Sequence, residues 1–209
     1  MIEISDILEA KRHTEGLKAV IFDLDDTLYS EKEYVKSGYQ KVAKVLPQIS
    51  NVEEKLWELF ESKKPAIDEL LAQEKIQSEK IKQECLLAYR QQVPEIHLYE
   101  GVMEMLIELR GKGLKLGIIT DGRPEGQRAK IQALGLESFV DHIIITDELG
   151  GPVFRKPNMT AFQIMKEKMN VLYDEMCYIG DNIKKDFIAP EKLGIRSIWF
   201  KNTDGLYVI

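Results

Sequence analysis

The stretch Val20-Ile21-Phe22-Asp23-Leu24-Asp25-Asp26-Thr27-Leu28-Tyr29 decides the fold that we expect. It begins with an apolar run rich in β-branched and aromatic side chains, which is typical of a buried strand. The run ends abruptly in three carboxylates and a hydroxyl. Open α/β sheets bind their ligands at the carboxyl ends of the strands. The stretch therefore predicts a strand that leads into a candidate functional site.

Asp23 and Asp25 are separated by a single residue. Two carboxylates held this close repel each other unless a cation lies between them. We infer a Mg²⁺ site in which one carboxylate is free to act as a nucleophile. On this stretch alone, an acidic turn that merely ends the strand remains an open alternative.

Composition narrows the class of protein. The chain has 209 residues, which suits one domain or one domain with an insertion, and 44% of them are hydrophobic, enough for a packed core. The formal net charge of −6 argues against a nucleic acid or an anionic membrane surface as a partner. It leaves room for a small phosphorylated substrate, because a metal ion and one lysine can reverse the local field.

The cysteines and the amino-terminal residues indicate the cellular compartment that we expect for the protein. Cys85 and Cys177 lie far apart and match no ligand spacing, so we interpret them as reduced thiols of a cytoplasmic protein. Residues 1–10 carry three acidic side chains and lack both a basic region and a long apolar core, so we do not expect a signal peptide. No apolar run approaches the length of a membrane span.

Residues 31–99 have the pattern of amphipathic helices. Val35, Tyr39, Val42 and Leu46 fall on one helical face, and charged residues fill the others. Prolines interrupt the pattern, which predicts about four helices and no strand. This segment is either a helical subdomain with solvated faces or a lid over the acids of the first strand.

Alternating strands and helices return after residue 100. Strands separated by helices of this length predict right-handed crossovers and a mainly parallel α/β sheet of about five strands. The expected strands are 17–23, 114–119, 142–146, 176–180 and 195–200. We also expect a short leading helix over residues 4–13. The chain thus divides into an α/β core of residues 1–30 and 100–209 and an all-helical domain of residues 31–99.

Polar residues follow several of these strands. In a parallel sheet, the carboxyl ends of neighbouring strands meet along one edge, so such residues converge although they are far apart in sequence. The candidates are Asp23 and Asp25, Thr120, Lys156 in the loop after the third strand, and Asp181 with Asp186 behind it.

These residues, in this order, resemble the four motifs of the haloacid dehalogenase (HAD) superfamily. The quoted motifs are Asp23-Leu24-Asp25-Asp26-Thr27, Thr120-Asp121-Gly122, Lys156-Pro157, and Gly180-Asp181 with Asp186. The resemblance covers nearly the whole chain and implies a Rossmann-like core. A helical insertion directly after the first motif resembles the phosphatase branch with a C1-type cap. Asp121 stands where some relatives have asparagine.

The resemblance also implies roles for the first and last motifs. Asp23 would attack phosphorus to give an aspartyl-phosphate, and Asp25 would serve as general acid and then as general base. The expected Mg²⁺ ligands are the carboxylates of Asp23 and Asp181 and the backbone carbonyl of Asp25. Asp186 would lie behind them and orient a metal-bound water or Lys156.

The middle motifs are expected to bind the transferred phosphoryl group. Thr120 would donate a hydrogen bond from its hydroxyl, and Lys156 would supply positive charge while holding the Asp23 carboxylate. Asp121 is expected to contribute to the same contacts with the substrate phosphate.

The expected function is a Mg²⁺-dependent phosphomonoesterase acting on a small phosphorylated metabolite. A sugar-phosphate mutase would use the same intermediate, and a phosphonate hydrolase would need a lysine from the cap. A non-enzymatic phospho-acceptor or binding module is a further alternative, although Asp23 and Asp25 on one strand argue against a receiver-like domain. The identity of the substrate and the oligomeric state remain open.

Overall fold

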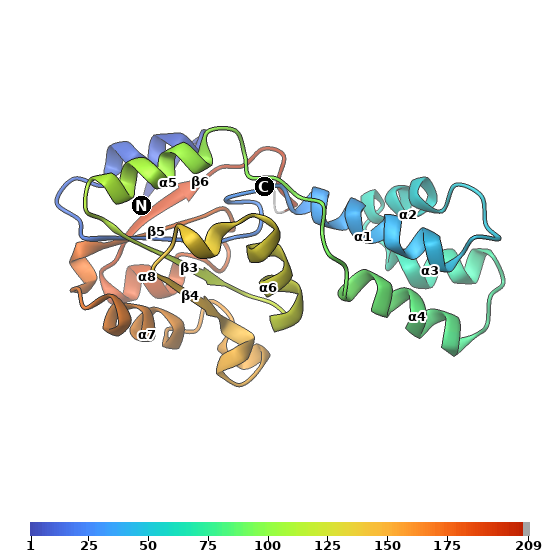
Figure 1. The fold of residues 1–209 in the computed structure, drawn as a ribbon. Coiled ribbons are helices and arrows are strands. Elements are labelled where there is room, and N and C mark those ends of the chain that lie inside the picture. The colour runs from blue at the N-terminus through green and yellow to red at the C-terminus, as the bar shows by residue number, and fades with distance from the viewer. Residues whose placement is uncertain (207–209) are drawn as a thin grey trace. The chain divides into compact units, whose positions relative to one another are not determined.

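The structure, a computed structural model, describes residues 1–206, which divide into two compact units (Figure 1). One unit comprises Met1–Glu31 together with the chain from His97 onward. The other comprises Lys32–Ile96. The first unit is built of strands and helices, and the second is built of helices alone.

Across residues 1–206, six strands form one sheet in the order β1-β6-β5-β2-β3-β4, and each neighbouring pair is parallel. The strands are β1 Ile2–Ile4, β2 Ala19–Phe22, β3 Lys115–Thr120, β4 His142–Ile145, β5 Met176–Gly180 and β6 Arg196–Phe200. This confirms the expected parallel α/β architecture, with one strand more than the five that we expected. Strand β2, which carries the opening stretch, lies between β3 and β5.

Helices cover both faces of this sheet, with α5 on one side and α7 and α8 on the other (Figure 1). The helices are α5 Val102–Gly111, α6 Pro124–Ala133, α7 Thr160–Met169 and α8 Ile188–Leu193. Ala19 and Ile21 of β2 pack in one cluster with Phe162 and Met165 of α7. Because the opposite face is covered as well, all four residues of β2 are fully buried, which explains its uninterrupted apolar sequence.

The amino terminus differs from the expectation of a helix over residues 4–13. Residues Ile2–Ile4 instead form the edge strand β1 beside β6, and a 3₁₀ helix, η1, follows at Ile7–His13. The Asp6 carboxylate accepts a hydrogen bond from the Leu8 backbone N–H (2.9 Å), which fixes the start of that helix. Three residues are too few to show the alternation that identifies a strand from sequence.

Further 3₁₀ turns connect the elements of the α/β unit. They are η2 Leu136–Ser138, η3 Thr146–Leu149, η4 Pro152–Phe154 and η5 Tyr173–Glu175. Turns η3 and η4 lie between β4 and α7, in the segment that carries Lys156.

The helical unit contains four helices within residues 32–96 and the adjoining Glu31, all of which are described. They are α1 Glu31–Val45, α2 Val52–Glu61, α3 Ala66–Gln73 and α4 Glu79–Arg90. Val35, Tyr39 and Val42 of α1 join Leu56 of α2 in the core of the unit, as their helical spacing predicts. Nowhere along residues 1–206 is a helix both long enough and apolar enough to cross a membrane.

The chain leaves the α/β unit and re-enters it at adjacent points. Tyr29 forms an antiparallel bridge with Leu98, and the Tyr99 backbone N–H donates to the Leu28 carbonyl (3.0 Å). The two ends of the helical insertion are therefore tied together by backbone hydrogen bonds within the α/β unit.

Candidate active site

The register of the sheet brings the ends of three strands together. Phe22 of β2 pairs with Ile118 of β3 and with Ile179 of β5. The residues that follow these positions, which include Asp23, Thr120 and Asp181, consequently lie at one edge of the sheet. Thr120 is fully buried, and the two carboxylates are less than a tenth exposed. The structure thus gathers at this edge the residues that the sequence places after these strands.

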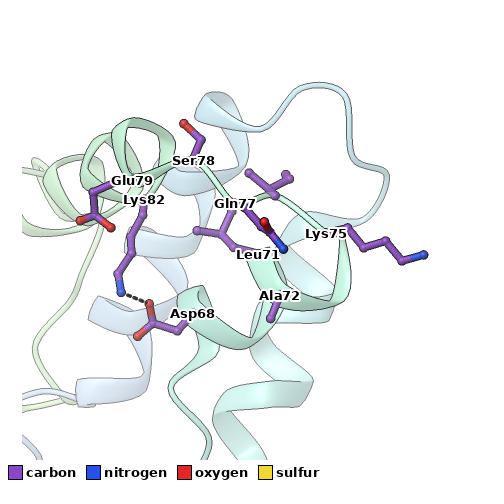
Figure 2. A pocket seen from close by; sticks show the side chains of 9 residues that line it. Asp68, Leu71, Ala72, Lys75, Gln77, Ser78, Glu79 and Lys82 are labelled. Atoms are coloured by element: carbon purple, nitrogen blue, oxygen red, sulfur yellow. Dashed lines mark ion pairs between the residues drawn. The ribbon is translucent and has the colours of Figure 1, made fainter.

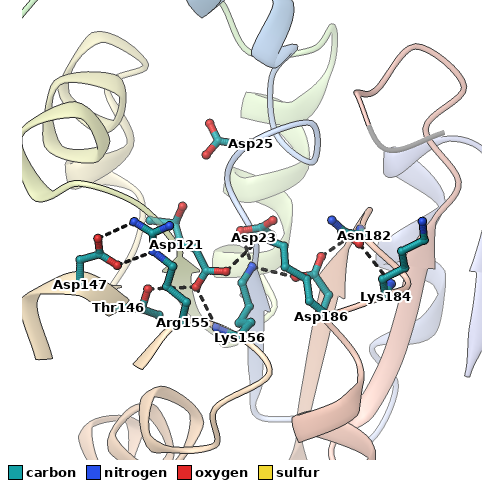
Figure 3. Close-up of polar contacts among 12 residues, drawn as sticks. Asp23, Asp25, Asp121, Thr146, Asp147, Arg155, Lys156, Asn182, Lys184 and Asp186 are labelled. Carbon is teal, nitrogen blue, oxygen red and sulfur yellow. Dashed lines mark hydrogen bonds and ion pairs between the residues drawn. The ribbon is translucent and has the colours of Figure 1, made fainter. Parts of the chain in front are cut away.

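Lys156 lies at the centre of these groups. Its Nζ lies 2.7 Å from Asp23 Oδ1 and 2.9 Å from Asp186 Oδ1 (Figure 3). It also donates a hydrogen bond to the Tyr178 hydroxyl (2.8 Å). Burial alone would lower the pKa of Lys156, but the charges of Asp186 and Asp23 hold it well above its ordinary value. The lysine is therefore a permanent cation between two carboxylates.

The carboxylates of Asp23, Asp181 and Asp186 form an acidic cluster in which one oxygen from each lies within 4.8 Å of the others. Burial raises the pKa of Asp23 to about 7, although Lys156 opposes the shift. Burial, together with the charges of Asp23 and Asp186, raises the pKa of Asp181 to about 9. Crowded carboxylate oxygens that resist ionisation are a donor set that a hard divalent cation fits, because the cation relieves their repulsion.

The segment after β5 is held close to this cluster. Asp186 Oδ2 accepts a hydrogen bond from the Asn182 backbone N–H (3.0 Å), and a Cβ on Gly180 would lie 2.5 Å from the same oxygen. Glycine at position 180 therefore permits the Asp186 side chain to fold back against the strand. On the other side, the Trp199 indole N–H donates to the Asp181 backbone carbonyl (2.9 Å).

Asp25 has different surroundings from Asp23 and lies apart from the Lys156 contacts in Figure 3. Its Oδ1 accepts hydrogen bonds from the Tyr29 hydroxyl (2.5 Å) and from Lys130 Nζ (2.6 Å), and its Oδ2 accepts one from Gln127 Nε2 (2.9 Å). Three side chains therefore hold the Asp25 carboxylate, which the motif resemblance alone does not indicate.

These contacts also set the charge of Asp25. Burial alone would raise the pKa of Asp25, but the charge of Lys130 and the hydrogen bonds from Lys130, Tyr29 and Gln127 hold it below its ordinary value. Two carboxylates one residue apart in sequence therefore have opposite electrostatic surroundings.

The Asp121 carboxylate is occupied by contacts that order neighbouring loops. Its Oδ1 accepts hydrogen bonds from the Thr146 hydroxyl (2.9 Å) and from the Lys156 backbone N–H (3.0 Å). Its Oδ2 lies 3.0 Å from Lys185 Nζ. The Asp121 side chain therefore positions the loop that carries Lys156 and does not face outward as a free acid.

Sequence reasoning missed several residues of this site. Lys185, which no motif singles out, lies in the turn before α8, and its ammonium pairs with Asp121. Tyr178 belongs to the apolar sequence of β5, and nothing in that sequence indicates that its hydroxyl reaches the site. Gln127 and Lys130 are one helical turn apart on α6, the helix that follows β3, so their spacing places them on one helical face but does not indicate that this face meets the site.

A hollow of about 570 Å³ lies within the helical unit between α3 and α4 (Figure 2). Leu71 and Ile76 contribute apolar surface, and an ion pair joins Asp68 to Lys82 (2.7 Å) at its side. An exposed ion pair of this kind is a common surface feature that contributes little free energy, so it does not by itself indicate a functional site. The edge of the sheet, with its buried charges, is therefore the candidate active site.

Comparison with known proteins identifies the family of the chain. A family profile described as haloacid dehalogenase-like hydrolase matches residues 20–200. The chain is 27% identical to a glyceraldehyde 3-phosphate phosphatase of Methanocaldococcus jannaschii over 200 residues, which covers 87% of this chain and 84% of the relative.

Solved structures share the fold. A HAD-superfamily hydrolase from Geobacter sulfurreducens superimposes with a TM-score of 0.68 at 20% identity, covering 90% of this chain and 89% of that one. A β-phosphoglucomutase-like protein from Thermotoga maritima gives a TM-score of 0.64 at 20% identity, with coverage of 87% and 84%.

Proposed function

Because the chain belongs to the haloacid dehalogenase-like hydrolase family, we propose that it is a Mg²⁺-dependent phosphomonoesterase that forms an aspartyl-phosphate on Asp23. The observation that carries the proposal is the contrast between Asp23 and Asp25. Asp23 belongs to the acidic cluster and contacts Lys156, whereas Asp25 is held by Lys130 on the other side. Two neighbouring carboxylates whose pKa values are shifted in opposite directions are suited to different chemical tasks.

The metal would be held by the carboxylates of Asp23 and Asp181 and by the backbone carbonyl of Asp25. When bound, Mg²⁺ supplies charge neutralisation for the phosphate and alignment for the reacting oxygens. The raised pKa values of Asp23 and Asp181 support this assignment, since burial penalises the charged form of both carboxylates and a bound cation would offset that penalty.

Asp23 attacks phosphorus through a carboxylate oxygen, and the bond from phosphorus to the leaving oxygen breaks. Lys156, fixed by Asp186 and Tyr178, supplies positive charge beside the transferred group and orients the nucleophile. The Thr120 hydroxyl donates to a phosphoryl oxygen. For Asp121 we propose a contact through its backbone N–H, since its carboxylate already has three partners.

Asp25 handles the protons. Protonated from solvent, Asp25 gives its proton to the leaving oxygen, and the resulting carboxylate takes a proton from the water that attacks the aspartyl-phosphate. This second proton restores the acid form for the next turnover. The lowered pKa of Asp25 favours the second of these roles, because an ionised carboxylate is ready to act as a base.

We propose that the helical unit is a C1-type cap and that the substrate is a small phosphorylated metabolite. The similarity to a glyceraldehyde 3-phosphate phosphatase supports a substrate of this size. A cytoplasmic location fits the two buried free cysteines, and the net charge of −6 supports a partner other than nucleic acid or a membrane surface.

The test of the nucleophile is Asp23→Asn. We expect Mg²⁺-dependent phosphate release from p-nitrophenyl phosphate in the wild type and a loss of at least about 10³-fold in the variant, because the covalent step is removed. Asp174→Asn, the same change at an exposed position, is the matched control. Wild-type turnover by a folded Asp23→Asn variant would contradict the proposal.

A sugar-phosphate mutase is the alternative, because it would use the same aspartyl-phosphate with a sugar hydroxyl in place of water. The two are separated by incubating the enzyme with a panel of phosphorylated metabolites that includes glyceraldehyde 3-phosphate and hexose phosphates. A phosphatase releases inorganic phosphate from its substrate, whereas a mutase returns an isomeric sugar phosphate.

A further inference from the structure

Helix α6 presents two buried polar side chains toward the edge of the sheet. Gln127 and Lys130 are separated by one helical turn and are 3% and 4% exposed. Amide and ammonium groups are rarely buried this completely unless their hydrogen-bonding capacity is used. Both reach Asp25, and Gln127 also reaches Thr120.

The Gln127 amide nitrogen joins these two residues. Nε2 donates to Thr120 Oγ1 (2.5 Å) and to Asp25 Oδ2 (2.9 Å), which uses both of its hydrogens. Because the Thr120 oxygen accepts a hydrogen bond from the amide, its own hydroxyl hydrogen must point elsewhere. Gln127 therefore leaves Thr120 as a donor toward the space where we place the phosphoryl group.

The backbone between these residues is shaped to admit the glutamine. Gly122 has φ +139°, a conformation that other residues rarely adopt. A Cβ built at Gly122 would lie 3.2 Å from two side-chain carbons of Gln127 and 3.3 Å from its amide oxygen. The glycine two residues after Thr120 thus gives room for the Gln127 side chain.

Lys130 holds the other oxygen of the same carboxylate. Its Nζ lies 2.6 Å from Asp25 Oδ1, the oxygen that also accepts from the Tyr29 hydroxyl. Gln127 from one side and Lys130 with Tyr29 from the other therefore fix the rotation of the Asp25 carboxylate. A carboxylate with both oxygens held has one orientation available to it.

We propose that Gln127 and Lys130 are positioning residues, which hold Asp25 in its working orientation and direct the Thr120 hydroxyl toward the phosphoryl group. The inference rests on the proposed function, because it assigns the two residues to act through Asp25 and Thr120. Both residues contact the Asp25 carboxylate, and their role requires no contact with phosphorus or with the nucleophile Asp23.

The kinetic test measures kcat and KM for p-nitrophenyl phosphate with Mg²⁺ in Gln127→Met and Lys130→Met. Hydrogen bonds to charged groups predict a fall in kcat of roughly 10- to 100-fold in each, with KM changed by less than about threefold because substrate contacts are retained. Lys130→Arg keeps the charge and should recover most of the loss. Gln132→Met, the same change on the exposed face of α6, should match the wild type.

A binding measurement, which needs no turnover, tests the contact between Gln127 and Thr120. Calorimetry with inorganic phosphate and Mg²⁺ should show that Thr120→Val and Gln127→Met each weaken binding by roughly 3- to 10-fold. If Gln127 acts through the Thr120 hydroxyl, the double variant should bind no more weakly than Thr120→Val alone. Independent, multiplied losses are instead the mark of a general structural effect.

The outcomes separate the two proposals. If the wild-type protein does not hydrolyse phosphate esters, the proposed function is wrong. The phosphate-binding measurements on the single and double variants then test the positioning role independently. A kcat of Gln127→Met within about twofold of Gln132→Met, or multiplied losses in the binding cycle, would overturn the positioning role. Thermal unfolding establishes that each variant is folded, and Gln127→Asn, which is too short to reach both partners, replaces Gln127→Met if that variant unfolds.

Discussion

Lys156 shows how one residue can carry both the stability and the chemistry of the site. A fully buried ammonium is tolerated because Asp23, Asp186 and Tyr178 surround it. Each of these partners needs the lysine in turn, since removal of one member of a buried ionic group leaves the others uncompensated. We therefore expect the loss of Lys156 to lower the stability of the folded protein as well as its activity.

Lys156→Met tests this expectation. The substitution leaves Asp23 and Asp186 buried without their cation, and the free energy of unfolding should fall by about 3–5 kcal/mol as measured by urea denaturation. Lys168→Met, an exposed position on α7, should change stability by less than about 0.5 kcal/mol. The double variant Lys156→Met/Asp186→Asn should be more stable than Lys156→Met, and a double variant that is less stable would contradict this account.

The residues that follow strands could be anticipated from sequence, because strand ends at a parallel edge must converge. Asp23, Thr120 and Asp181 are of this kind, and the structure places them at that edge. Tyr178, Gln127 and Lys130 could not be anticipated in the same way. Their importance depends on which face of a strand or helix meets the site, and sequence order alone does not specify it.

The adjacent strands β2 and β5 hold two acidic side chains in unfavourable electrostatic surroundings. Their adjacent ends bring Asp23 and Asp181 together, and the pKa values of these acids rise to about 7 and about 9. Between the ordinary aspartate pKa of 3.8 and these raised values, Asp23 and Asp181 therefore hold protons in the folded protein that they lose in the unfolded chain. Without metal, these two groups make stability fall as the pH rises from about 4 to about 9.

Magnesium should reverse this loss in a pH-dependent manner. At about pH 8.5 a concentration of 100 times the dissociation constant contributes about 2.7 kcal/mol, or roughly 5–10 °C in the unfolding midpoint. At about pH 5.5 the protons on Asp23 and Asp181 compete with the ion, so the shift should be much smaller. Thermal denaturation with and without MgCl₂ measures both, and equal shifts at the two pH values would argue against a metal on these carboxylates.

Element prediction succeeded where periodicity was long and failed where it was short. The amphipathic repeat in α1 and the apolar run of β2 each extend over enough residues to define a face. Strand β1 has three residues and is held by its pairing with β6, nearly two hundred residues further along the chain. An element stabilised by such a distant partner leaves little local signal in sequence.

At the scale of the whole molecule, the candidate catalytic residues all belong to the α/β unit, whereas Lys32–Ile96 form a unit with its own core. The bridge between Tyr29 and Leu98 keeps the ends of that insertion together. The α/β unit should therefore fold when the insertion is replaced by a connection of about four glycine and serine residues, the length of an ordinary hairpin loop.

This shortened protein tests the role of the cap. We expect it to hydrolyse p-nitrophenyl phosphate with kcat/KM within about tenfold of the wild type, because the reacting groups remain. If the helical unit acts as the proposed cap, the preference of this protein among phosphorylated metabolites should be largely lost when the unit is removed. Retention of the full substrate preference would mean that the helical unit does not select substrates.

The contact between Trp199 and the Asp181 carbonyl gives the protein a built-in optical reporter. Only two tryptophans are present in the sequence, and they fall in different units, with Trp57 on α2 beneath the Lys36 ammonium (4.5 Å). In a Trp57→Phe variant, fluorescence would come from one indole, hydrogen-bonded to the backbone of a proposed metal ligand. Its emission could then be followed in a stopped-flow instrument as ions and phosphates arrive and leave.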